Sequence, residues 1–183
     1  LATEGLAARG ANGLVLYDLD GRNRQVISEE GFWGQFSPDG RRIAYAGPGW
    51  QLHVYDLDRG EDRVIPTAVG YGIKWSADGE WLAYINTSDA TGISLNVIRP
   101  DGGDPRVLVR HHQIGNVGFS PLDGKLYFTK RYLPENKDQT LHAVDLVSGS
   151  VEDLGTLPEP GVLFFDRSGE HLLLDTERTG FVY

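Results

Sequence analysis

The stretch Phe36-Ser37-Pro38-Asp39-Gly40, followed by Ile43-Ala44-Tyr45, returns along the chain and decides its fold class. Further copies begin at Trp75 and Phe119, and a weaker copy begins at Phe165. The leading aromatic residues therefore stand 39, 44 and 46 residues apart. A period of this length is typical of a propeller blade built from four short strands.

Each unit contains four short apolar segments that we interpret as β-strands. The Ser-Pro-Asp-Gly phrase suits the turn between the first two strands, because Pro fixes φ at the second position and Gly accepts positive φ at the fourth. A second apolar phrase forms the third strand, and a turn that contains Gly leads to the fourth. The third strands begin at Leu14, Leu52, Leu95 and Leu141. Since no helical period is sustained, we predict an all-β propeller of four-stranded blades.

The leading aromatic of each unit has a packing role in this interpretation. One twisted sheet cannot bury both of its faces alone, so neighbouring blades must pack face to face. We therefore expect Phe36, Trp75 and Phe119 to lie in strands and to fill the wedge between adjacent blades.

The 183 residues are predicted to form one domain of about four to five repeats. Complete blades at about 32–69, 70–113 and 114–159 lie between partial blades at 1–31 and 160–183. The last strands could complete the first blade and close a four-bladed ring, or the repeats could form an incomplete ring or arc. The two ends supply too many strands for one blade and too few for two, which favours the arc. Exposed strand edges on an arc would favour self-association.

Composition narrows the classes of partner. The formal net charge of −9 argues against nucleic acid, which requires a basic face, and against an anionic membrane surface. The chain has no Cys, which excludes a disulfide framework and a Cys metal site. No apolar run approaches about 18 residues, and the first residues lack the pattern of a signal peptide. We expect no direct membrane insertion by this segment.

The repeated phrase resembles the WD40-like PD40 repeat of the TolB family of β-propellers. The resemblance covers about residues 5–176 and is closest at Phe36–Tyr45 and Trp75–Tyr84. It implies a bacterial, periplasmic or extracytoplasmic protein-binding module, such as the sensor domain of a larger membrane-anchored protein. It also implies an alternative, a structural or gating propeller beside a prolyl-oligopeptidase-like catalytic domain outside this chain. Both are analogies from fold, and a fold does not fix a function.

One face of the predicted propeller collects the candidate binding residues. The loops from second to third strands, and from each fourth strand to the next blade, gather at the same face, where loops on a rigid scaffold often bind ligands. Aromatic residues and Arg are typical interface anchors. The candidates for contact with a protein partner or small-molecule ligand are Trp33, Trp50, Tyr71, Arg110, His111 and Tyr132. The alternative is that these aromatics cap the blade edges.

We predict no catalytic residue, no metal site and no cofactor. Neighbouring residues on a strand point to opposite faces, so His111 and His112 would not converge on one ion. Asp39, Asp78 and Asp123 recur at one turn position, which indicates a structural role. The chain lacks a G-x-S-x-G motif and a Gly-rich phosphate loop that opens a helix. The expected function is non-enzymatic, and a hydrolase with a site on the channel face is the rival interpretation.

Overall fold

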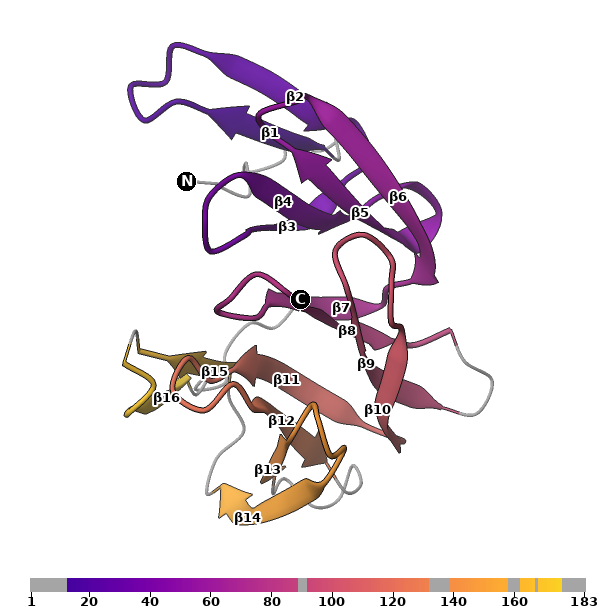
Figure 1. The fold of residues 1–183 in the computed structure, drawn as a ribbon, viewed down its shortest axis with the longest axis vertical. Coiled ribbons are helices and arrows are strands. Elements are labelled where there is room, and N and C mark those ends of the chain that lie inside the picture. The colour runs from indigo at the N-terminus through magenta and orange to yellow at the C-terminus, as the bar shows by residue number, and fades with distance from the viewer. Residues whose placement is uncertain (1–12, 89–91, 132–138, 158–161, 167, 176–183) are drawn as a thin grey trace, which may run out of the picture.

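The chain folds into an arc of antiparallel sheets (Figure 1). The computed structural model describes residues 13–88, 92–131, 139–157, 162–166 and 168–175. Within these residues sixteen strands form five sheets, and one short 3-10 helix spans Pro48–Trp50. None of the described helical structure has the length and apolar character needed to cross a bilayer. The predicted all-β propeller architecture, as an incomplete ring, is confirmed.

Three sheets are complete blades whose four strands pair in the order of the chain. The first contains β3 (Phe32–Phe36), β4 (Arg42–Ala46), β5 (Gln51–Asp56) and β6 (Glu61–Ala68). The second contains β7 (Tyr71–Trp75), β8 (Leu82–Asn86), β9 (Ile93–Ile98) and β10 (Arg106–His111). The third contains β11 (Ile114–Phe119), β12 (Leu126–Arg131), β13 (Gln139–Val144) and β14 (Val151–Leu157). Strands β3, β7 and β11 lie on the inner side of the arc, where neighbours contact one another (Figure 1).

The two remaining sheets lie at the ends of the arc and contain two strands each. One pairs β1 (Leu14–Tyr17) with β2 (Arg24–Ser28), and the other pairs β15 (Val162–Phe165) with β16 (Leu172–Asp175). They form two separate sheets, so within the described residues the ends do not combine into one closing blade. The strands predicted at residues 5–9 and 181–183 lie outside the described residues.

The Ser-Pro-Asp-Gly turn is held by its own side chains. The Ser37 hydroxyl donates to Asp39 Oδ1 at 2.5 Å, and the Arg42 amide donates to Ser37 Oγ at 2.9 Å. Gly40 has φ 71°, the left-handed value expected for the fourth position. The hydrogen bond from Ser37, with one from the Arg41 amide, lowers the pKa of Asp39. The same serine–aspartate contact recurs in the next blade, which confirms the structural role of these aspartates.

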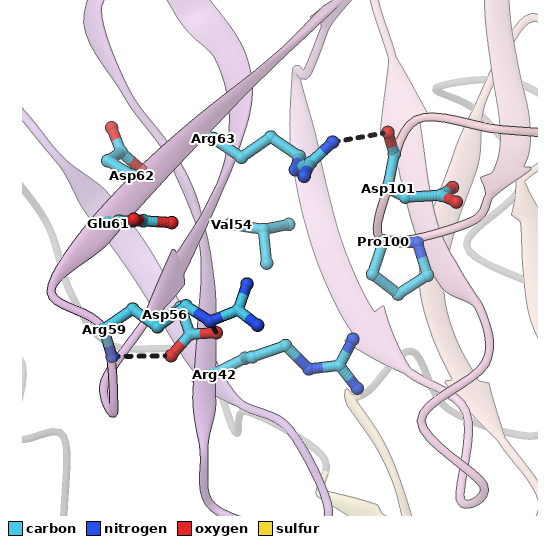
Figure 2. Close-up of a pocket in the computed structure, with 9 residues that line it drawn as sticks. All are labelled: Arg42, Val54, Asp56, Arg59, Glu61, Asp62, Arg63, Pro100 and Asp101. Atoms are coloured by element: carbon cyan, nitrogen blue, oxygen red, sulfur yellow. Dashed lines mark hydrogen bonds and ion pairs between the residues drawn. The ribbon is translucent and has the colours of Figure 1, made fainter.

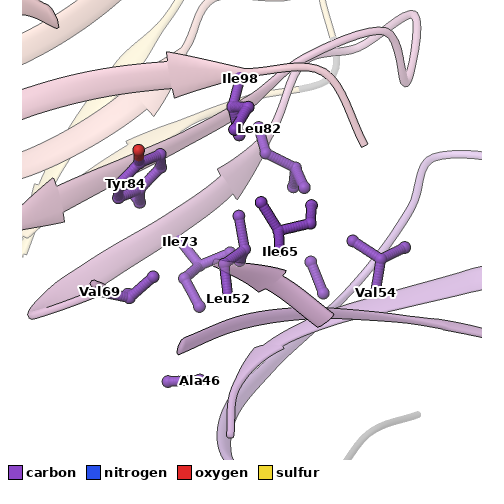
Figure 3. Close-up of a cluster of buried hydrophobic side chains, with 10 residues drawn as sticks. Ala46, Leu52, Val54, Ile65, Val69, Ile73, Leu82, Tyr84 and Ile98 are labelled. Atoms are coloured by element: carbon purple, nitrogen blue, oxygen red, sulfur yellow. The ribbon is translucent and has the colours of Figure 1, made fainter. Parts of the chain in front are cut away.

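The cores of the molecule lie between blades (Figure 3). Side chains along β8 alternate, because successive residues of a strand point to opposite faces. Leu82 and Tyr84 pack toward the blade β3–β6, and Ala83 and Ile85 pack toward the blade β11–β14. The blade β7–β10 therefore contributes to two separate apolar clusters.

The leading aromatics pack against these clusters, as predicted. Phe36 contacts the cluster that contains Leu14, and Trp75 contacts the cluster between the first two complete blades. Phe119 is 9% exposed and belongs to the next cluster. Trp75 also donates from Nε1 to the Gln35 carbonyl oxygen at 3.0 Å, which ties β7 to β3. Every one of these residues lies in a strand.

Candidate functional site

The connections β2–β3, β4–β5, β6–β7, β8–β9 and β10–β11 lie at one end of the sheets, which we call the loop end. This placement follows from the antiparallel order of each blade, since strands one and three start where strands two and four finish. The Ser-Pro-Asp-Gly turns lie at the opposite end. We therefore expect the candidate binding residues at the loop end.

Phe32, Trp33 and Trp50 form an aromatic cluster at the loop end. Phe32 makes edge contacts with both tryptophans, with ring centroids 4.9 Å from Trp33 and 4.8 Å from Trp50. The two indole rings lie 5.9 Å apart and are tilted by 56°. Trp50 is 53% exposed although it belongs to this cluster. The two indoles thus make the adjoining sides of a corner that is open to solvent.

This corner borders a hollow of about 440 Å³ between the first two complete blades, which we call the loop-end hollow. Small-molecule sites commonly have volumes of roughly 300–1,000 Å³. Its lining residues are Trp33, Gly49, Trp50, Ala68, Val69, Gly70, Asn86, Thr87 and Ser88. None of these side chains is charged, although 23% of the chain consists of charged residues.

Hydrogen bonds fix the loops around the hollow. The Val69 amide donates to the Trp50 carbonyl oxygen at 2.7 Å, and the Gly70 amide donates to the Ile85 carbonyl oxygen at 2.7 Å. A Cβ on Gly70 would lie 2.6 Å from Thr87 Oγ1, so the absence of a side chain lets the two blades approach closely here. The walls of the hollow are consequently held by the framework of both blades.

Both tryptophans of the hollow have a left-handed backbone. Trp33 has φ 59° and Trp50 has φ 60°, and among the described residues the only other non-glycine with positive φ is Asp104. A bulky residue in this conformation is a genuine outlier. Such strain costs of order 1–3 kcal/mol and persists where the surroundings impose it, commonly at ligand-binding sites.

The other predicted binding residues do not belong to this aromatic corner. Tyr71 lines a second hollow of about 370 Å³ between the next two blades, and its hydroxyl donates to the Ile114 carbonyl oxygen. Arg110 and His111 end β10, where His111 Nδ1 lies 3.0 Å from the Gln113 carbonyl oxygen. Tyr132 lies outside the described residues.

The sequence did not predict a charged hollow that lies between the same two blades at the end opposite the loop end (Figure 2). Its volume is about 410 Å³, and seven of its nine lining residues are charged. The lining residues are Arg42, Val54, Asp56, Arg59, Glu61, Asp62, Arg63, Pro100 and Asp101. Arg63 bonds the Asp101 carbonyl oxygen at 3.4 Å, and Arg42 bonds that of Gly79 at 3.2 Å. Charges of both signs alternate here, so the hollow favours neither an anion nor a cation.

The histidines show a structural pattern. His53 and His142 are 6% and 3% exposed and occupy matching positions on β5 and β13, as the repeat predicted. Burial, together with the charge of Lys130, lowers the pKa of His142. The rings of His111 and His112 lie 6.1 Å apart. In the part of the chain that the structure describes, no three His, Asp or Glu residues are placed to hold a metal ion.

Comparison with known proteins identifies the fold. No family model and no curated sequence matches the chain. The solved structure of TolB from Acinetobacter baumannii superposes with a TM-score of 0.70 at 18% identity, over 94% of this chain and 46% of that one. The chain has the fold of a TolB-like β-propeller. It spans about half the length of that TolB.

Two further structures share this TolB-like fold. An auxiliary nutrient binding protein from Bacteroides thetaiotaomicron has a TM-score of 0.60 at 14% identity, over 79% of this chain and 36% of that one. Tricorn protease has a TM-score of 0.68 at 14% identity, over 88% of this chain and 17% of that one. Proteins of both binding and catalytic type thus contain the fold, and the function must be argued from the site.

Proposed function

We propose that this TolB-like propeller is a non-catalytic recognition module that binds a protein or small ligand at the loop-end hollow. The observation that carries the proposal is the pair of left-handed tryptophans at its border. Glycine would satisfy the same φ without penalty, so the strain at these two positions is the cost of keeping an indole there. The strain is explained if the indoles are retained to contact a ligand.

The surroundings of the two indoles support the same function. Trp50 is half exposed and borders a hollow of suitable size, and polar groups of Asn86, Thr87 and Ser88 face it from the next blade. Ligand sites commonly combine apolar aromatic walls with a few polar groups that fix orientation. The likeness to a nutrient binding protein is consistent with this use of the fold.

The proposal can be tested through the indole signals. The chain has four tryptophans, so isotope labelling of the indole nitrogens gives a simple NMR spectrum that Trp→Phe variants can assign. We expect ligands from a chemically mixed library to shift the signals of Trp33 and Trp50. Trp75, bonded to Gln35, and Trp81, covered by the Arg99 guanidinium at 4.0 Å, serve as internal controls. A library that never shifts Trp33 or Trp50 more than the two controls would refute the proposal.

The likeness to tricorn protease favours a second candidate, a propeller that regulates access to a catalytic domain outside this chain. In that case the full-length protein hydrolyses peptides, and Trp50→Ala changes KM for long substrates more than for short ones. A recognition module instead predicts that the isolated chain and the full-length protein bind the same ligand with equal affinity.

We also propose that the protein lies outside the cytoplasm. The PD40-type repeat supports it, and so does the likeness to TolB. Fractionation of cells that express the tagged full-length protein from its own promoter provides the test. Recovery with cytoplasmic markers would contradict this setting without affecting the binding site.

A further inference from the structure

We propose that the ligand of the loop-end hollow is a neutral saccharide, an inference that rests on the proposed function of that hollow. Among the described residues its lining contains no charged side chain, whereas the charged hollow on the same two blades has seven. A charged ligand that enters the loop-end hollow loses hydration and finds no counter-charge, which is costly. The described part of the lining therefore favours an uncharged ligand.

The indole corner requires a ligand with an apolar face. Trp33 and Trp50 are tilted by 56° to each other, so they offer two flat apolar surfaces at an angle. Indole surfaces give large contact areas at a small cost in side-chain entropy, because few torsions are fixed. The C–H face of a pyranose ring is a flat apolar surface of the size of an indole and can pack against either wall.

The lining residues at the end of β8 supply polar groups that suit a ligand with hydroxyl groups. Ser88 donates from its amide and its hydroxyl to Asn86 Oδ1, at 2.8 and 2.7 Å, which fixes the Asn86 amide. The donor group of Asn86, Nδ2, therefore lies outside this turn, and Thr87 contributes a hydroxyl that both donates and accepts. Groups that donate and accept at short intervals match the hydroxyls around a sugar ring.

A neutral saccharide satisfies both walls at once. An aliphatic ligand would pack on the indoles and leave the amide and hydroxyl wall unpaired, which costs free energy on binding. A capped peptide segment is the competing macromolecular occupant, because it is also neutral and carries amide groups. It would need a large apolar side chain at the corner and would not depend on the Thr87 hydroxyl.

The experiment compares defined probes by calorimetry and by the indole signals. The neutral probes are cellohexaose, maltohexaose, mannohexaose and xylohexaose. The charged counterparts are the hexamers of galacturonic acid and of glucosamine, and capped uncharged tetrapeptides form a third group. The variants are Trp50→Ala, Thr87→Val, and Tyr17→Ala as a matched control. Tyr17 is an aromatic residue of β1 that is 40% exposed and does not line the hollow.

We expect saturable binding of at least one neutral hexasaccharide, with shifts at Trp33 and Trp50. Its affinity should fall about tenfold or more in Trp50→Ala, by a smaller factor in Thr87→Val, and remain unchanged in Tyr17→Ala. The charged hexamers should bind more weakly. Failure of all four neutral hexasaccharides, or binding that survives Trp50→Ala, overturns the saccharide proposal. If tetrapeptides or other compounds still shift Trp33 and Trp50, the recognition function stands and only the ligand class is wrong.

Discussion

The blades β3–β6 and β7–β10 share one framework and differ in the residue that takes a left-handed backbone at the bulge of the innermost strand. In both blades the pairing register shifts at the start of the innermost strand, between Phe32 and Gln35 and between Tyr71 and Lys74. The left-handed residue in the second blade is Gly72, with φ 74°, whereas the first blade has Trp33 there. A left-handed residue at this bulge therefore need not be an indole, and β11 has the same register shift without a positive φ at Gly115 or Asn116.

A pair of matching positions on the third strands shows how the two blades accommodate a buried polar residue. On their third strands the two blades carry the buried polar residues His53 and Asn96. His53 Nδ1 lies 2.7 Å from Asp62 Oδ2, and Asn96 Nδ2 donates to the Ser94 carbonyl oxygen at 2.9 Å. Both side chains thus make a hydrogen bond within their own blade, although Nε2 of His53 is buried without a hydrogen-bond partner among the described residues. Variation inside the blade is therefore structural, and variation at the loop end is where function can enter.

The largest effect should come from what the blades share. Phe119→Ala removes a leading aromatic from the cluster between the second and third complete blades. We expect a loss of about 3–5 kcal/mol of unfolding free energy, the usual cost of deleting a buried aromatic. Urea denaturation followed by circular dichroism measures it. Leu122→Ala, at a site that is 66% exposed, is the control and should change the free energy by less than about 0.5 kcal/mol.

The bulge of the second blade should tolerate no side chain. Gly72→Ala combines a left-handed alanine with a Cβ only 3.0 Å from Val117 Cγ1, so we expect a loss of about 2 kcal/mol. Gly149→Ala has nearly the same φ, 70°, with nothing within 4 Å of the added Cβ, and should lose about 1 kcal/mol. Equal losses in the two variants would show that backbone strain alone matters at Gly72. Thermal denaturation monitored by circular dichroism ranks them.

Two variants separate the effect of backbone strain at Trp50 from the effect of its indole ring. Trp50→Gly and Trp50→Ala both remove the indole, but only glycine relieves the left-handed backbone at φ 60°. We expect the glycine variant to be about 1 kcal/mol more stable than the alanine variant. Both should lose ligand binding equally. A more stable alanine variant would mean that the backbone relaxes, and the strain would then no longer argue for function.

The smallest effect concerns the buried polar position and its pH dependence. The folded state lowers the pKa of His142 through burial and the charge of Lys130, so the unfolded chain binds the proton more readily. Stability should therefore decrease as the pH falls below 6.5, the ordinary pKa of the side chain, toward its lower value in the folded state. His142→Asn, which copies Asn96, should flatten that slope. Denaturation midpoints across this pH range provide the measurement, and an unchanged slope would contradict the assignment.

Much of the fold could be predicted because its determinants are local. The spacing of Phe36, Trp75 and Phe119, together with the turn at Asp39, was enough to give blades, strand order and the wedge positions. The pairing of Trp33 with Trp50 around one hollow could not be predicted, because it depends on a left-handed backbone that the identity of tryptophan argues against. The separation of Tyr71 into a second hollow depends on how adjacent blades meet, which no local pattern specifies.

The exposure of the hairpin β15–β16 affects the order in which parts of the molecule unfold. Leu163 is 3% exposed, yet Phe164 and its cross-strand partner Leu173 are 46% and 64% exposed. In repeat proteins stability is close to a sum of nearest-neighbour terms, and among the described residues the hairpin contacts β11 whereas the blade β7–β10 shares an apolar cluster with the blade on each side. Amide hydrogen exchange should therefore be faster in the hairpin than in β8 and β9, so that these parts of the chain unfold stepwise rather than as one cooperative unit.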